Sequence, residues 1–218
     1  MDQHTNTIPT TCTTIIGTEL ANIEDILTLN NLSGKGKYTR PCEQWLEQFM
    51  KDNNGRALVV SSCTSALEMA AILADMQAGD EVIVPSYTYV TTVNAFALRG
   101  AVPVFVDVDD ATMNIDATLI ERAITPKTRA IIPSPLWRAC MRHGQNHGGR
   151  QKTPAGQMLG TIGNVGCLSV QEKKNFTAGG QGGALHVNDP ALVERAEILY
   201  DNGTNRLRFM RGEVDHYQ

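Results

Sequence analysis

The segment GDEVIVPSYTYVTTVNAFALRGAVPVFVDV, Gly79–Val108, decides the fold class. Two short apolar runs, EVIV at 81–84 and VPVFV at 102–106, lie on either side of a helical pattern over 89–98. A strand, a helix and a second strand within about 30 residues are typical of a right-handed crossover between parallel strands. The segment therefore predicts a parallel sheet with a helix packed on one face.

The same alternation continues on both sides of this unit. Periodicity predicts further strands at 57–60, 129–132, 165–170 and 184–187, and helices at 61–76, 115–124 and 190–200. Helices are also expected at 17–29 and 40–51, the second with Trp45, Leu46 and Phe49 on one face. We predict an α/β fold, a mostly parallel sheet with helices on both faces.

Composition excludes several classes of function. The chain has 218 residues, 42% of them hydrophobic and 19% charged, with a net charge of −4, as in an ordinary globular protein. The acidic balance gives no reason to expect nucleic acid or an anionic membrane as partner. The polar start is no secretory signal, and no apolar run approaches the ~18 residues of a membrane span. Five scattered cysteines without a C-x-x-C pair favour reduced thiols and a cytoplasmic location.

A run of short polar side chains, Ser61-Ser62-Cys63-Thr64-Ser65, connects the strand expected at 57–60 to its helix. Ligands of open parallel sheets bind at the carboxyl ends of the strands, where this run lies. Free amide N–H groups and the positive end of the helix dipole favour a phosphate group there. Serine is also a common helix cap, and the run by itself favours simple capping over a phosphate site.

Two lysines, Lys173 and Lys174, follow the strand expected at 165–170 and precede the turn AGGQGG. A partly desolvated lysine at a strand end can form a Schiff base, although lysines in solvated turns are far more common. Tyr87 and Tyr89, after the strand at 81–84, are either half-buried core or a cover for a flat ring. Because G-x-G-x-x-G and G-x-x-x-x-G-K-[ST] are both absent, the combination favours pyridoxal phosphate over a nucleotide.

Three stretches then identify a family resemblance: SSCTSALEMA at 61–70, residues 79–109, and LGTIGNVGCLSVQEKKNFTAGGQGGAL at 159–185. They resemble the DegT/DnrJ/EryC1/StrS sugar-nucleotide aminotransferases, as do the shorter TMNID, LIERAIT, RPCEQWLEQ and GTNR. The likeness covers nearly all of residues 14–133 and 158–217. It implies the large domain of a fold-type-I transferase that depends on pyridoxal 5′-phosphate and forms a homodimer.

The resemblance also implies residue roles. Lys174 matches the lysine that bonds covalently to the cofactor, whereas Lys173 falls on a variable position. Thr64, Ser65 and Ser169 match the ligands of the cofactor phosphate, and Tyr89 matches the aromatic residue that stacks on the pyridine ring. Two positions depart from the family pattern, because glutamine stands in place of histidine at Gln171 and in place of glutamate at Gln181.

The retained lysine implies the aminotransferase branch, since the sugar dehydratases of this family carry histidine at that position. The likeness is greatest to members that use glutamate as amino donor and a dTDP-sugar, dTDP-4-keto-6-deoxyglucose, as acceptor in enterobacterial common antigen synthesis. These small molecules are therefore the expected partners, and no metal is expected.

The stretch 134–157, SPLWRACMRHGQNHGGRQKTPAGQ, has no acid and no periodicity. When the codons that could encode residues 135–153 are read from their second base, the genetic code permits the string HYGVxACDMDKIMAxAKKH. This string resembles the family's loop and amphipathic helix. We interpret residues 135–153 as out-of-frame translation, after which the normal frame resumes at AGQMLGTIG. A zinc site at Cys140, His143 and His147 lacks a fourth ligand, and a basic nucleic-acid arm is at odds with the acidic remainder.

We therefore expect an N-terminal helix and loop at 1–37 and a cofactor-binding large domain at 38–218, aberrant over 134–157 and without the small C-terminal domain of the family. The resemblance places the aspartate that pairs with the pyridine nitrogen in a strand reading VVEDAAQ, which this sequence lacks. Little or no transaminase activity is expected. The alternative function is that of a catalytically inactive remnant of such an enzyme.

Overall fold

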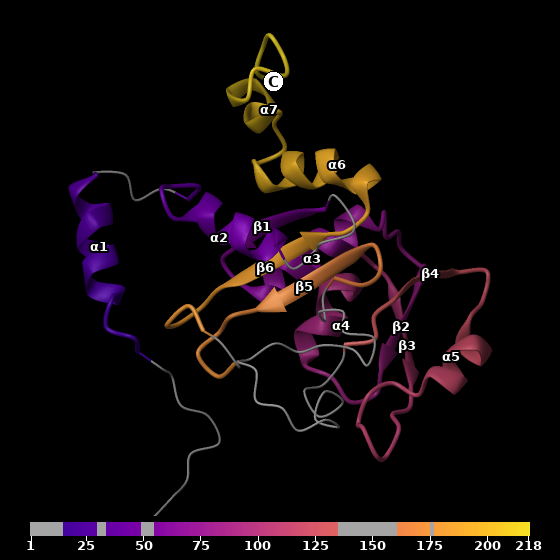
Figure 1. Cartoon of the computed structure of the whole chain (residues 1–218). Coiled ribbons are helices and arrows are strands. Elements are labelled where there is room, and N and C mark those ends of the chain that lie inside the picture. Colours follow the sequence, from indigo (N-terminus) through magenta and orange to yellow (C-terminus); the bar gives the residue numbers. More distant parts are fainter. Residues whose placement is uncertain (1–14, 30–33, 49–54, 135–160, 175–176) are drawn as a thin grey trace, which may run out of the picture.

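The computed structural model describes residues 15–29, 34–48, 55–134, 161–174 and 177–218 (Figure 1). Six strands in this part of the chain form two three-stranded sheets. The first has the order β1-β6-β5, from Arg56–Val60, Gly183–Val187 and Val165–Ser169. The second has the order β3-β2-β4, from Val102–Val106, Glu81–Pro85 and Thr128–Ile131. The predicted strands are all present, within one or two residues at each end.

The helices also follow the prediction. Two helices precede β1, namely α1 (Glu19–Thr28) and α2 (Thr39–Glu47). Four others alternate with the strands or follow them: α3 (Cys63–Leu73), α4 (Val90–Ala97), α5 (Ala117–Ala123) and α6 (Pro190–Tyr200). Helix α6 begins where predicted because Asp189 accepts a hydrogen bond from the amide of Ala191 and Pro190 occupies the first turn. A further short helix, α7 at Arg206–Met210, was not predicted.

Strand direction differs between the two sheets. Strand β2 runs parallel to both β3 and β4, as expected for crossover units. Strand β6 runs antiparallel to both β1 and β5, which the prediction of a mostly parallel sheet did not anticipate. The reason is the connection, since a loop rather than a helix joins β5 to β6 and such a loop returns the chain in the opposite direction.

Helix α3 holds the two sheets together. One core cluster combines Leu67 and Ala71 of α3 with Val82 and Val84 of β2 and with α4. A second combines Ala66 and Leu73 of the same helix with β1, β6 and α6. The helix therefore packs against both sheets with different side chains, and it lies behind β5 and β6 in Figure 1.

The opposite face of the first sheet is covered by α2. Leu46 of α2 is buried against Ala57 and Ala184, whereas Trp45 is 48% exposed, so the face predicted for Trp45, Leu46 and Phe49 is only partly buried, and Phe49 lies outside the described residues. An ion cluster joins the same elements. The Arg56 guanidinium donates to Glu43 at 2.8 Å and to Glu197 at 3.0 Å, linking β1 to α2 and α6.

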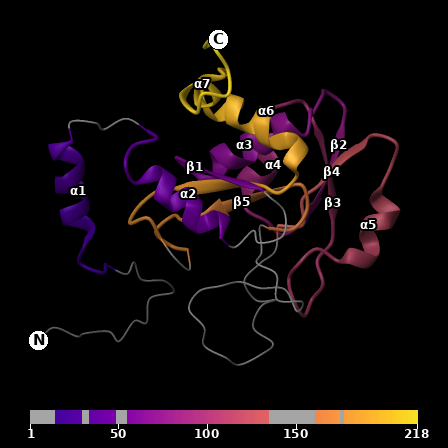
Figure 2. The same cartoon turned by 45° about the horizontal axis from the view of Figure 1, so that its top comes forward.

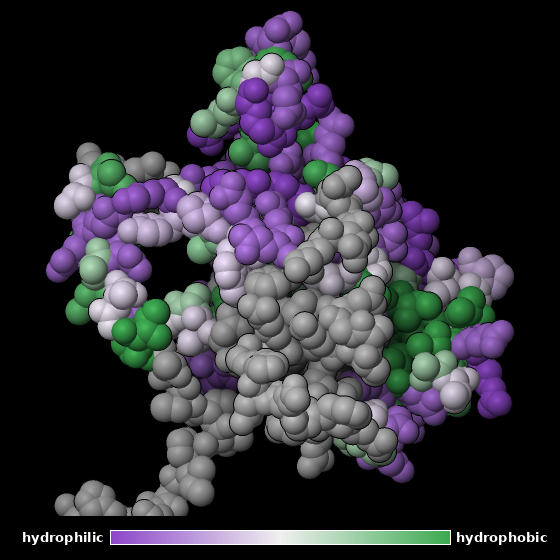
Figure 3. Space-filling model, viewed as in Figure 1, coloured by the Kyte–Doolittle hydropathy of each residue, from purple (hydrophilic) through white to green (hydrophobic). Residues whose placement is uncertain are grey.

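Several apolar side chains of the described residues are exposed. Helix α1 has no buried residue and stands apart from the sheets in both views (Figures 1 and 2). Apolar surface also gathers near β3, β4 and α5 (Figure 3), where Val102, Phe105, Ile124 and Ile131 are about half exposed. None of the described helices is long and apolar enough to cross a membrane.

Candidate functional site at the start of helix α3

The first turn of α3 is both capped and open to an anion. The Ser62 hydroxyl accepts a hydrogen bond from the amide of Ser65 at 3.1 Å, which is the predicted capping arrangement. Within the described residues, no acceptor is present for the amides of Cys63 and Thr64. These two donors lie at the positive end of an 11-residue helix, where they favour a bound anion. Capping and anion binding are therefore compatible here.

Gly183 brings this helix end directly onto the sheet. Gly183 pairs with Val60 of β1 on one side and with Ser169 of β5 on the other. A methyl group at its Cα would lie 2.5 Å from the Cys63 nitrogen and 2.5 Å from the Ser62 carbonyl carbon. Only glycine allows this approach, because the atoms it meets are backbone. The sequence prediction did not single out Gly183, although the GQGG pattern is a signal of close backbone approach.

Ser169 lies on the face of β5 that α3 covers. Val165 and Cys167 pack against the cluster formed by α3, β1, β6 and α6. Side chains alternate along a strand, so the half-buried Ser169 shares their face. The structure thus brings Ser169 and the first turn of α3, with Thr64 and Ser65, to the same edge of the sheet, as three candidate phosphate ligands require.

Lys174 lies in the turn that follows β5. Its amide donates to the Gln171 carbonyl at 2.9 Å, and its side chain is exposed. Burial raises the pKa of the Cys63 thiol, and the positive charge of Lys174 opposes that rise. Lys174 is therefore within electrostatic range of the first turn of α3, and no corresponding influence on this pKa comes from Lys173. The partial desolvation expected for a Schiff-base lysine is not present in the described structure.

Tyr89 lies at the carboxyl end of β2, where it is the residue before α4. Its side chain is 73% exposed and that of Tyr87 is 57% exposed, so neither is half-buried core. The Thr88 hydroxyl lies 2.9 Å from the Ser134 hydroxyl, which ties the end of β2 to the residues after β4. Both tyrosines are thus accessible to a ligand at the carboxyl end of β2.

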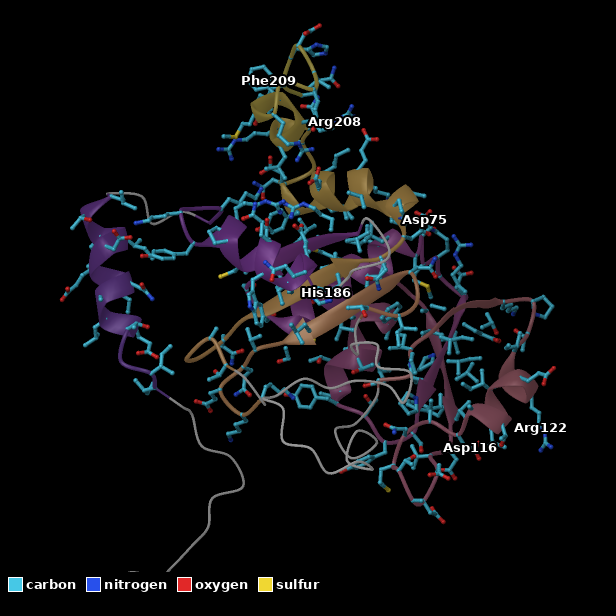
Figure 4. The ribbon with its side chains drawn as sticks, in the orientation of Figure 1. Asp75, Asp116, Arg122, His186, Arg208 and Phe209 are labelled. Carbon is cyan, nitrogen blue, oxygen red and sulfur yellow. The ribbon has the colours of Figure 1, made fainter. Side chains whose placement is uncertain are left out.

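Other sequence candidates contribute less. The Gln171 side chain accepts from the Lys173 amide at 3.0 Å, and Gln181 is exposed. The alternative zinc ligands lie outside the described residues, and no group of three potential ligands occurs within them. His186, labelled in Figure 4, is buried on the central strand β6 rather than at the candidate site. Residues 135–153, interpreted as out of frame, also lie outside the described residues.

Comparison with known sequences gives a consistent result. The sequence model of the DegT/DnrJ/EryC1/StrS aminotransferase family matches residues 13–142 and 139–216. The spore coat polysaccharide biosynthesis protein SpsC of Bacillus subtilis is 34% identical over 71% of this chain and 43% of its own length. A UDP-N-acetyl-3-dehydro-α-D-glucosamine 3-aminotransferase of Acidithiobacillus ferrooxidans is 36% identical over 72% of this chain and 50% of its own length. The chain spans about half the length of these relatives.

Comparison with solved structures supports the same fold. An aminotransferase from Psychrobacter cryohalolentis superposes with a TM-score of 0.77 at 27% identity, covering 96% of this chain and 55% of that one. The aminotransferase TlmJ from Streptoalloteichus hindustanus superposes with a TM-score of 0.77 at 30% identity, covering 97% and 60%. The α/β architecture described above is therefore that of an aminotransferase, incomplete relative to the solved chains.

Proposed function

Since the chain belongs to the DegT/DnrJ/EryC1/StrS aminotransferase family, we propose that it holds pyridoxal 5′-phosphate at the edge formed by β1, β5 and the start of α3. The observation that carries the proposal is the contact of Gly183 with the first turn of α3. This contact places free helix amides, short hydroxyls and the Ser169 side chain at one edge. Lys174 is close enough to this edge to act on Cys63.

Each candidate residue has a distinct task in this proposal. The phosphate is bound by two backbone amides, those of Cys63 and Thr64, and by three hydroxyls, those of Thr64, Ser65 and Ser169. The Lys174 amine would hold the cofactor covalently at its carbonyl end and, once released from it, would carry a proton beside the substrate. The exposed Tyr89 ring packs on the pyridine ring. When bound, the cofactor supplies an electron sink for cleavage of bonds to the substrate α-carbon or sugar carbon.

The fit is incomplete at the pyridine nitrogen. An acid beside that nitrogen keeps it protonated and so maintains the electron sink. The sequence contains no aspartate or glutamate from Ser134 to Gln171. The residues present therefore fit the phosphate and the carbonyl end of the cofactor better than its ring nitrogen.

For the complete reaction we propose transfer of an amino group from glutamate to dTDP-4-keto-6-deoxyglucose. The products are dTDP-4-amino-4,6-dideoxygalactose and 2-oxoglutarate, and the pathway is cytoplasmic synthesis of enterobacterial common antigen. The support is the resemblance of the motifs at 61–70, 79–109 and 159–185. The relatives named above include one whose substrate is a different, UDP-linked sugar, so the motifs alone support this choice.

A second candidate function is that of an inactive remnant that binds the cofactor without turnover. The lack of an acid in 134–171 favours it, because an acid beside the pyridine nitrogen maintains the electron sink.

Borohydride trapping tests cofactor binding separately from turnover. The purified chain is mixed with pyridoxal phosphate, reduced with borohydride and digested, and the labelled peptide is located by mass spectrometry. We expect the label on Lys174, with none in Lys174→Ala and an unchanged amount in Lys173→Ala. Label on Lys173, or equal label on all exposed lysines, would refute the binding site.

Turnover is then measured with glutamate and dTDP-4-keto-6-deoxyglucose. We expect a rate lower than that of a full-length relative by a factor of about 10³ or more, which corresponds to about 4 kcal/mol of transition-state stabilisation. A rate near one per second that Lys174→Ala abolishes would contradict the inactive-remnant function. Trapping on Lys174 without turnover would support it.

A further inference from the structure

Two thiols lie beneath the proposed phosphate site, and neither has a role in the function proposed above. Cys63 is the first residue of α3 and Cys167 is in the middle of β5. Both are half buried, and neither is in a disulfide. Both pack against the same core cluster, which α3, α4 and β2 form. A short distance between them is therefore possible despite their separation in the sequence.

The strand register gives the direction of approach. The Cys63 amide nitrogen lies over Gly183, and Gly183 pairs with Ser169 of β5. Cys167 is two residues before Ser169, so its side chain projects from the same face of β5. That face is the one covered by α3, because Cys167 packs against α3 residues in two clusters. Cys63 begins the helix that covers Cys167.

Electrostatics agree with this placement. Burial raises the pKa of the Cys167 thiol, and a charge on Cys63 raises it further. Burial also raises the pKa of Cys63, with Lys174 acting in the opposite sense. Such an influence of one thiol on the other requires that they be near each other. Both are therefore protonated near neutral pH, and their chemistry is that of a neutral dithiol.

We propose that Cys63 and Cys167 form a dithiol site for a soft, thiophilic ligand of the trivalent arsenical class. Thiol sulfur is a soft ligand, and two converging thiols hold such an atom better than one. With phenylarsine oxide, two S–H bonds break, two As–S bonds form, and the oxygen leaves as water. Arsenic stays trivalent, so no oxidant or reductant is consumed.

Occupation of the site would close the proposed phosphate site. The bridge would join the first residue of α3 to β5, immediately beside the amides of Cys63 and Thr64 and the Ser169 hydroxyl. An arsenical would therefore compete with phosphate or with pyridoxal phosphate. This consequence rests on the proposed function, but the binding of the arsenical does not.

The test uses a chain in which the other three cysteines, Cys12, Cys42 and Cys140, are replaced by serine. Intact mass after treatment with phenylarsine oxide should show one phenylarsenic group per chain, resistant to a monothiol and removed by a dithiol. Cys63→Ser or Cys167→Ser in this background should lose the resistant adduct. Circular dichroism checks that each variant is folded, and Cys→Ala replacements serve if a serine variant is not.

Two further measurements complete the test. Dibromobimane should cross-link the peptides that contain Cys63 and Cys167, which a separate reaction at each thiol would not do. The dithiol site would be overturned if no cross-link formed and the resistant adduct survived in either single variant. An adduct that forms normally but does not reduce pyridoxal phosphate trapping on Lys174 would refute only the link to the proposed function.

Discussion

Replacement of Gly183 by alanine is the change that most directly tests the candidate site. The added methyl group would lie 2.5 Å from the Cys63 nitrogen and 2.7 Å from the Ser62 carbonyl oxygen. Those atoms are backbone and cannot rotate away, so the first turn of α3 must move off the sheet. Overpacking of this kind costs about 3 kcal/mol, at the upper end of the usual range. For a chain of this size the loss corresponds to a decrease of roughly 6–12 °C in melting temperature.

The matched control is Gly180→Ala, in the loop just before β6, because a methyl group there would meet no atom within 4 Å. Melting is followed by circular dichroism for the wild type and both variants, and pyridoxal phosphate trapping on Lys174 is measured below the melting temperature. We expect Gly183→Ala to lose stability and trapping, and Gly180→Ala to lose neither. If the two variants melt and trap alike, the close contact between β6 and the start of α3 is not what forms the site.

Three further predictions concern the elements around the site. Arg56→Met leaves Glu43 and Glu197 without a buried partner and should cost about 3 kcal/mol in urea unfolding, whereas Arg195→Met, at an exposed pair, should cost less than about 1 kcal/mol. Burial opposes ionisation of Glu197, but hydrogen bonds from arginines lower its pKa below 4.5. Its stabilisation is therefore complete above about pH 4.5 and is lost as pH falls through the lowered pKa, so the stability difference between wild type and Glu197→Gln should disappear in acid. Ser62→Ala removes the cap of α3 and should lower the unfolding free energy by about 1 kcal/mol; an unchanged urea midpoint would show that the cap is dispensable.

Local patterns predicted most of the elements because each carries its own signal. The strand at 102–106 and the helix at 190–200 match the prediction residue for residue, since the apolar run and the Asp189–Pro190 start are local features. The helix at 206–210 was missed because five residues are too short for periodicity to appear. The direction of β6 was missed because the expectation of parallel crossovers was applied to a connection that contains no helix.

The candidate site, like the fold, was only partly predictable from the sequence. Residue type and position pointed to the run 61–65, whereas Ser169 came from the family resemblance; strand pairing brings Ser169 to the edge where that run lies. The assignment of Lys174 over Lys173 also came from the family resemblance and stays a prediction. The role of Gly183 and the proximity of Cys63 to Cys167 depend on contacts between segments far apart in the sequence, which no local pattern encodes.

The pairing of β1 with β6 also determines when this protein can complete its fold during synthesis. Strand β2 pairs with β3, the strand that follows it along the chain, so that pair can form soon after both leave the ribosome. Arg56 of β1, however, pairs with Val187 of β6, which is synthesised only after β2, β3, β4 and β5. Until residues 183–187 have been translated, Leu58 and its neighbours on β1 lack their partner strand. From the synthesis of β1 until that of β6, the nascent chain thus carries an apolar strand without this partner, which makes that strand a target for chaperones and a site for aggregation.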